Sequence, residues 1–209
     1  MKSGDLKIGY LMVSSPIPNV YIGGLMVTDG RGLPVEFRYT EPIQPTKIQQ
    51  VLYGQVLSAY IKREVVLETL LKNIESKFKC LLVEDEQMLD YPAKGYSIVR
   101  IAATKSAPLG PVGKTQDIAP GELLLQVNAE TSPVRLYLGK PKSNAPDEAS
   151  DASTAGSPGN PGDASGELIS FLLDAGKAMD VVEPLRRVEK ALEIICQEEG
   201  IPASSQAAR

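Results

Sequence analysis

Hydrophobic positions in the first forty residues come in short runs that predict β-strands. Lys7–Ser14 and Tyr21–Thr28 are apolar and β-favouring, and 29–32 supplies a glycine-rich turn. Leu33–Tyr39 then alternates apolar and polar residues, as expected of a strand with one face in water. Two of these runs, joined by the turn, predict a hairpin.

Beyond residue 45 the apolar spacing changes from two to three and four. Thr46 stands at an N-cap position, and the segment up to Ile74 has the pattern of a long amphipathic helix. Gly54 lies inside it, where we expect a kink or a break. Its apolar stripe is wide enough to lie against a sheet.

Further strands are predicted after this helix, at Lys79–Val83, Tyr96–Ala103, Glu122–Asn128 and Val134–Leu138, with a long loop at Lys105–Gly121. Three strands, one dominant helix and four strands favour an α+β fold with a mostly antiparallel sheet and the long helix packed on one face. This element order is comparable to the profilin-like or longin-like layout.

Composition divides the chain into four segments. Residues 1–141 are the predicted core domain, and 142–166 hold almost only Ala, Ser, Gly, Pro, Asn and acids, which predicts a disordered acidic linker. Residues 167–200 predict two amphipathic helices, the second starting at a capping box of Asp180 and Glu183 and ending at Gly200. Residues 201–209 predict a disordered tail.

The overall charge and the cysteines limit the expected partners and the cellular compartment. A net charge of −4 and a pI near 5.1 give no general attraction to phosphate backbones or anionic lipid, so nucleic acid is not expected as a partner. Cys80 and Cys196 lie in apolar runs and read as packed thiols. No run is long enough to cross a membrane. We predict a cytoplasmic chain of bacterial type.

The absence of histidine removes the commonest general base and most catalytic zinc sites. Carboxylates remain: Glu84, Asp85 and Glu86 follow a buried strand, and Asp90 lies nearby. Carboxylates at a strand end can bind Mg²⁺ or Mn²⁺, so these four are the candidate metal ligands.

Two other patterns are weaker. Gly113-Lys114-Thr115 resembles the end of a phosphate-binding loop, but Pro108 stands where that loop needs glycine, so no nucleotide cofactor is predicted. A basic patch interleaved with tyrosines is typical of nucleic-acid binding, but acids dilute it and a solvated helix face explains it as well. Its members are Arg31, Arg38, Lys47, Lys62, Arg63, Tyr39, Tyr53 and Tyr60.

Short tethered helices are marginal in water unless their apolar faces are covered. They can dock on their own domain, on a second copy or on another protein. The main functional prediction is a non-catalytic adaptor or assembly subunit, binding a protein partner or itself through Leu168, Leu172, Leu185, Val188, Leu192 and Ile195. The alternative is a metal-dependent enzyme acting on a phosphate-containing substrate through the acidic strand end.

Overall fold

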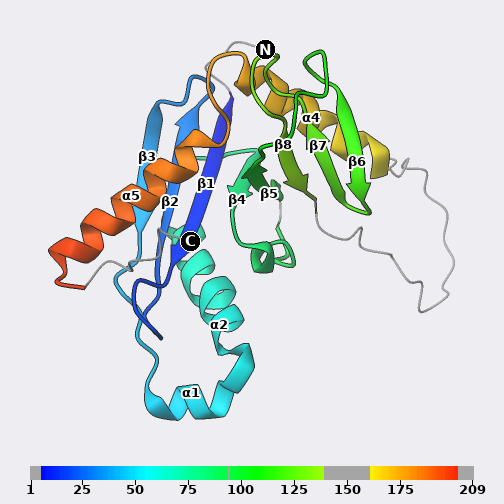
Figure 1. The fold of residues 1–209 in the computed structure, drawn as a ribbon. Helices are drawn as coiled ribbons and strands as arrows, with labels where there is room; N and C mark the ends of the chain where they lie inside the picture. Colours follow the sequence, from blue (N-terminus) through cyan, green and yellow to red (C-terminus); the bar gives the residue numbers. More distant parts are fainter. Residues whose placement is uncertain (1–5, 94, 139–160, 202–209) are drawn as a thin grey trace, which may run out of the picture.

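The computed structural model describes residues 6–93, 95–138 and 161–201, which form one eight-stranded sheet with helices on both faces (Figure 1). The strand order across the sheet is β3-β2-β1-β4-β5-β8-β7-β6. No helix in this described part is long and apolar enough to cross a membrane. The strands are β1 (Lys7–Ser14), β2 (Ile22–Asp29), β3 (Pro34–Tyr39), β4 (Cys80–Val83), β5 (Ser97–Ala103), β6 (Thr115–Ala119), β7 (Glu122–Leu125) and β8 (Val134–Tyr137).

The sheet is mostly antiparallel around a parallel centre. β4 pairs in parallel with β1 on one side and with β5 on the other, and all other pairings are antiparallel. The long connection between β3 and β4 carries the helices of 47–73, which is the type of crossover that a parallel pairing requires. The predicted α+β class with a mostly antiparallel sheet is confirmed.

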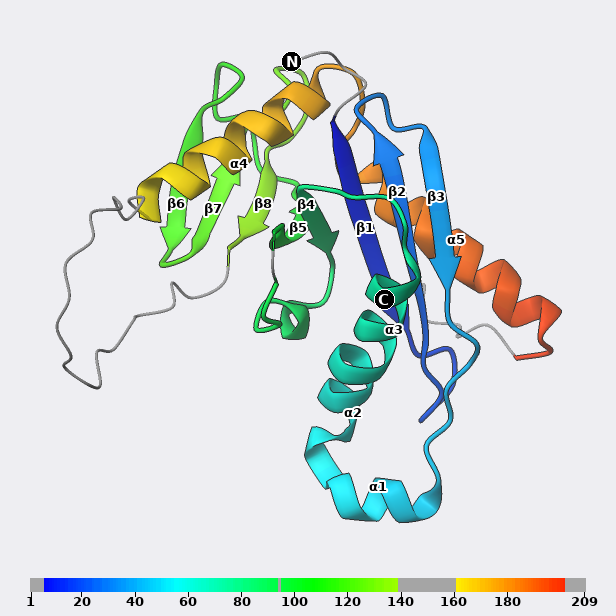
Figure 2. The same cartoon turned by 180° about the vertical axis from the view of Figure 1, so that it is seen from behind.

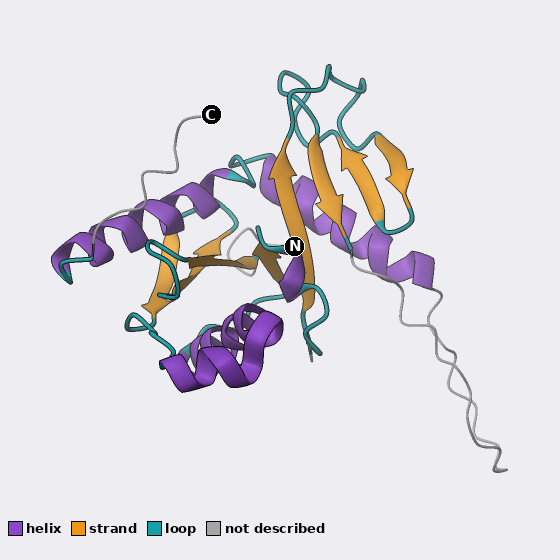
Figure 3. Ribbon diagram, turned by 60° about the horizontal axis from the view of Figure 1, so that its bottom comes forward, coloured by secondary structure: helices purple, strands orange, loops and turns teal. Residues whose placement is uncertain are grey.

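Alternate residues of the central strands face two separate apolar cores. Ile8, Tyr10 and Met12 of β1 point to the core under α4 (Pro161–Gly176) and α5 (Glu183–Glu198). Leu11 points to the opposite core, under the helices of 47–73. Figure 3 shows the sheet between these helical layers, and Figure 2 shows α4 lying across β6, β7 and β8.

The two C-terminal helices dock on their own chain. Five of the six residues predicted to bind a partner are buried in the core with the sheet, and the sixth packs against that core: Leu168, Leu172, Leu185, Val188 and Leu192, then Ile195. In this arrangement their side chains are not available to a partner. Helix α4 also begins at Pro161, inside the predicted linker, whereas residues 142–160 of that linker and 202–209 of the predicted tail lie outside the described residues.

The segment 47–73 forms helical turns of several kinds. They are α1 (Lys47–Tyr53), η1 (Gly54–Val56), α2 (Leu57–Tyr60), the π-helical η2 (Ile61–Leu67) and α3 (Glu68–Asn73). The predicted cap is confirmed, since Thr46 and Gln49 form a reciprocal capping box, and the regular helix breaks at Gly54. The stripe covers the sheet only from Leu57 onward.

One strand was not predicted and one further helix start differs, whereas the predicted strands keep their places with ends shifted by up to three residues. The predicted loop at 105–121 contains strand β6, whose residues are all exposed and therefore carry no apolar alternation. Helix α5 begins at Glu183, and Asp180 accepts a hydrogen bond from the backbone N–H of Val182 (2.9 Å) instead of capping the helix. Both differences come from local backbone pairing that residue type alone does not specify.

Candidate functional site

The carboxyl ends of β1 and β4 meet at one edge of the sheet because these strands are parallel. Leu11 pairs with Val83, so the next residues along the two strands are Met12 and Glu84. A hollow of about 230 Å³ opens at this edge, lined by the ends of both strands and by Met88. Ligands of open α/β sheets commonly bind at such carboxyl ends, so this edge is the first candidate site.

Glu84 reaches this edge on the face that carries α5. Side chains alternate along a strand, and Glu84 therefore points to the same side as Leu82, whose core includes α5. Partial burial raises the pKa of the Glu84 carboxyl, and the nearby negative charge of Glu189 raises this pKa further. Glu189 gives no signal in the sequence, because only the docking of α5 brings it near β4.

Arg100 links the same edge to the neighbouring strands. Its Nε donates a hydrogen bond to the backbone oxygen of Glu84 (2.7 Å), and its guanidinium lies 4.3 Å from the centre of the Tyr137 ring. The guanidinium of Arg135 lies 5.7 Å from the centre of the same ring. Arg100 is paired with Val83 and so lies on the face opposite to α5, where it holds the backbone of Glu84; its positive charge lowers the pKa of the Glu84 carboxyl, against the larger effect of burial.

The four predicted metal ligands do not converge. Asp85 pairs with Lys62 (2.6 Å), Glu86 lies 3.9 Å from Arg100, and Asp90 lies 4.0 Å from Arg63. Among the described residues no three acidic, cysteine or histidine side chains are grouped closely enough to hold a metal ion. Met12, a thioether, stands beside Glu84, and Mg²⁺ prefers oxygen ligands. The residues present do not fit a carboxylate-bound metal centre. Metal binding by these four residues stays a prediction.

Substituting Glu84 tests the electrostatics of this edge. A folded-state pKa above the unfolded value means that the fold favours the protonated carboxyl, so this stabilisation is present at low pH and is lost as pH rises through the folded pKa. We expect the stability of Glu84→Gln relative to wild type to improve from about pH 4 to pH 8, as measured by urea unfolding. Glu193→Gln, an exposed site on α5, is the control, and a loss of relative stability at pH 8 would contradict the assignment.

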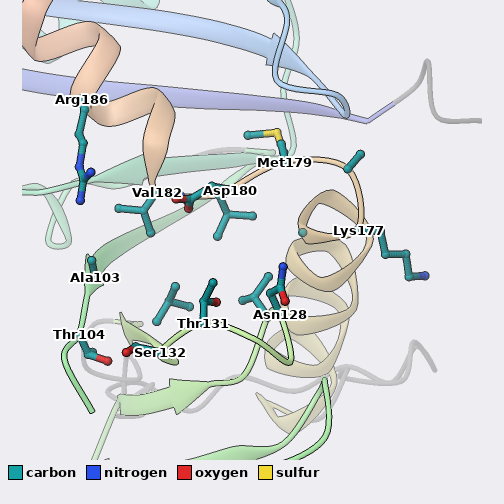
Figure 4. Close-up of a pocket in the computed structure, with 15 residues that line it drawn as sticks. Ala103, Thr104, Asn128, Thr131, Ser132, Lys177, Met179, Asp180, Val182 and Arg186 are labelled. Atoms are coloured by element: carbon teal, nitrogen blue, oxygen red, sulfur yellow. The ribbon is translucent and has the colours of Figure 1, made fainter. Parts of the chain in front are cut away.

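A second hollow, of about 560 Å³, lies between the end of β5, the β7–β8 turn and the α4–α5 connection (Figure 4). Asp180, Asn128 and Thr131 point into it, and Arg186 enters from α5. Lys177 points away and pairs with Asp174 (2.7 Å). Because acidic, basic and neutral groups line it together, this hollow does not select one class of ligand by charge.

Comparison with known proteins finds similarity only in structure. No protein-family model and no curated protein sequence matches the chain. Endonuclease V of Streptomyces avermitilis superposes with a TM-score of 0.55 at 11% identity, over 95% of this chain and 84% of that one. Human endonuclease V gives 0.55 at 12% identity, over 93% and 86%.

A third structure, endonuclease V of Ciona intestinalis in complex with a 23mer DNA containing an inosine followed by a ribo-adenosine, gives a TM-score of 0.51 at 10% identity, over 92% of this chain and 86% of that one. The fold resembles that of endonuclease V. The predicted profilin-like or longin-like layout is therefore wrong: the strand order has parallel pairings at its centre, and the C-terminal helices belong to the core.

The same comparison corrects two functional predictions. The non-catalytic adaptor was inferred from free tail helices, but those helices are core elements and the similar structures are nucleases. That prediction is wrong, and with it the assignment to protein binding. The expectation that nucleic acid is not a partner is wrong as well, because overall charge was used to judge a property that depends on local surfaces.

Proposed function

We propose that this protein is an enzyme acting on the phosphodiester backbone of nucleic acid, with its reacting centre at the carboxyl edge of β1 and β4. The observation that carries the proposal is the likeness to endonuclease V structures over more than nine-tenths of the chain. Glu84 supports it, because it places an acid–base group at the edge where both parallel strands end.

The residues at this edge suggest roles that need no bound metal. Because the pKa of the Glu84 carboxyl is raised, this group would take a proton from the attacking hydroxyl or water and pass it to the oxygen that leaves phosphorus as the P–O bond breaks. The Arg100 guanidinium, held at the same edge by the backbone oxygen of Glu84, would attract the phosphate backbone. Cleavage should therefore rise with pH through the pKa of Glu84.

A second candidate is nucleic-acid binding without cleavage. It is favoured by Met12, which puts a thioether at the position beside Glu84, and by the lack of a group of three metal-ligating side chains in the described part of the chain. The two candidates share a nucleic-acid ligand and differ in whether a bond is broken.

Binding and cleavage measured on the same labelled oligonucleotides separate them. We expect single-stranded DNA or RNA to bind with an affinity that falls linearly in logarithm with salt concentration. Wild type should cleave it on denaturing gels, with and without added Mg²⁺ or Mn²⁺, and Glu84→Gln should cleave about 10²–10⁴-fold more slowly while still binding. Glu193→Gln, exposed on α5, is the matched control.

Three other outcomes would contradict one or both candidate functions. Salt-dependent binding with no cleavage of any oligonucleotide would replace the enzyme with the binding protein. Cleavage that Glu84→Gln leaves unchanged would remove Glu84 from the reacting centre. Absence of binding to DNA and RNA at about 50 mM salt would overturn both candidates.

A further inference from the structure

The segment α1–η1–α2, residues 47–60, exposes an apolar surface unlike the rest of the molecule. Ile48, Val51, Leu52 and Val56 are 71%, 82%, 75% and 63% exposed, and α1 contains no buried residue. Single exposed apolar side chains are ordinary, but a contiguous group of large ones marks a contact surface. We call this segment the apolar hairpin.

In the described part of the chain nothing buries the apolar side chains of α1. Residues 1–5, 94, 139–160 and 202–209, the stretches outside the described part, contain one large apolar side chain in total, that of Met1. The remaining large apolar residues belong to the described fold.

The charges near the apolar hairpin are mixed. Residues 47–60 contain one cationic residue, Lys47, and no aspartate or glutamate, whereas Lys62 and Arg63 lie against Asp85 and Asp90 and are followed by Glu64. The whole chain is acidic, so residues 47–60 differ in sign from the molecule that carries them. An exposed apolar and aromatic tip with one cation is compatible with nucleic acid, where cations meet phosphates and apolar or aromatic groups meet bases.

The apolar hairpin stands beside the proposed reacting centre. Lys62, in η2 directly after α2, pairs with Asp85 in the loop that follows β4 (2.6 Å). Figures 1 and 2 show α1 and α2 projecting beyond the sheet at the end where β1 finishes. A strand bound along the carboxyl edge would pass the apolar hairpin.

Two tyrosines on the apolar hairpin provide aromatic faces. The rings of Tyr53 and Tyr60 lie 4.8 Å apart at an angle of 37°, and the residues are 37% and 39% exposed. Gly54, with φ +51° and no neighbour within 4 Å of an added Cβ, lets the chain turn between them. Bases stack on such rings without regard to sequence.

We infer that the apolar hairpin binds unpaired bases of the nucleic acid held at the carboxyl edge, through stacking on Tyr53 and Tyr60 and apolar contact with Val51 and Leu52. This inference rests on the proposed function. It assigns the ligand class as single-stranded nucleic acid, because bases paired in a duplex do not offer their faces to side chains.

The test compares affinities for a fluorescein-labelled single-stranded oligonucleotide over a salt series. Tyr53→Ala/Tyr60→Ala and Val51→Ser/Leu52→Ser are each expected to raise Kd about 5–100-fold with the salt slope unchanged, because stacking releases no counterions. Tyr53→Phe/Tyr60→Phe should retain the wild-type affinity. Leu33→Ser/Val35→Ser removes two other exposed apolar side chains, 53% and 47% exposed on and beside β3, and should bind as wild type does.

Each outcome has a separate meaning. If wild type binds no nucleic acid, the proposed function fails and the inference fails with it. If wild type binds and the hairpin variants bind equally well, the inference alone is wrong. If Val51→Ser/Leu52→Ser converts a dimer into a monomer by light scattering with affinity unchanged, the surface joins two copies and the inference is again wrong. Thermal unfolding checks that the variants, altered only at exposed sites, remain folded.

Discussion

Leu192→Ala is expected to lower the free energy of unfolding by about 2–5 kcal/mol, the range for truncating a fully buried leucine. Leu192 is 1% exposed on α5, and a Cβ added at Gly24 of β2 would lie 3.1 Å from its Cδ2. Truncation therefore leaves a cavity between α5 and the sheet that the close backbone of β2 cannot fill. Urea unfolding measures the loss.

Ile194 provides the matched control on the same helix. Its side chain is 56% exposed, so Ile194→Ala should change the free energy of unfolding by no more than about 0.5 kcal/mol. Equal effects at positions 192 and 194 would mean that α5 does not dock on the sheet. A large loss only at 192 would confirm that the C-terminal helices complete the core.

Gly23→Ala is expected to destabilise the fold by about 1–3 kcal/mol through overpacking. Gly23 lies on β2, and an added Cβ would come within 2.1 Å of Cγ1 of Val66 on η2. Val66 is fully buried, so neither its side chain nor the new methyl group has room to move. Gly166→Ala, in α4 with no atom within 4 Å of the added Cβ, should be neutral or slightly stabilising and serves as the control.

The combination with Val66→Ala identifies the cause. Removing the Cγ1 atom that meets the new methyl group should make the double variant more stable than the sum of the two single changes predicts, by about 0.5–3 kcal/mol. Simple additivity would show that Gly23 matters for its backbone and not for its contact with η2. The free energies of unfolding of wild type, the two single variants and the double variant distinguish these two causes.

Much of the fold could be predicted from the sequence because its signals are local. The strand at Lys7–Ser14 was predicted with its observed bounds, and the cap at Thr46 and the break at Gly54 follow from residue type. Strand β6 could not be predicted, since its residues are all exposed and only pairing with β7 makes them a strand.

The candidate site also contains one residue that the sequence predicts and others that only the tertiary structure brings near it. Glu84 was singled out because carboxylates after a buried strand are visible in the sequence. Its neighbours were not: Glu189 comes near it from α5, and Arg100 of β5 donates a hydrogen bond to its backbone oxygen. Asp85 and Asp90, which are close in sequence, lie against Lys62 and Arg63 instead. Side-chain alternation and the crossing of a distant helix decide which charges meet.

The sequence by itself determined all strands except β6, the helix start at Thr46, the α+β class and the presence of a strand-end acid, because each depends on short-range periodicity or backbone chemistry. Only the tertiary structure decided that the C-terminal helices cover their own sheet and that the apolar face of 47–56 covers nothing. An amphipathic pattern shows that a helix needs a contact surface, but it does not specify the surface, because burial free energy is not directional.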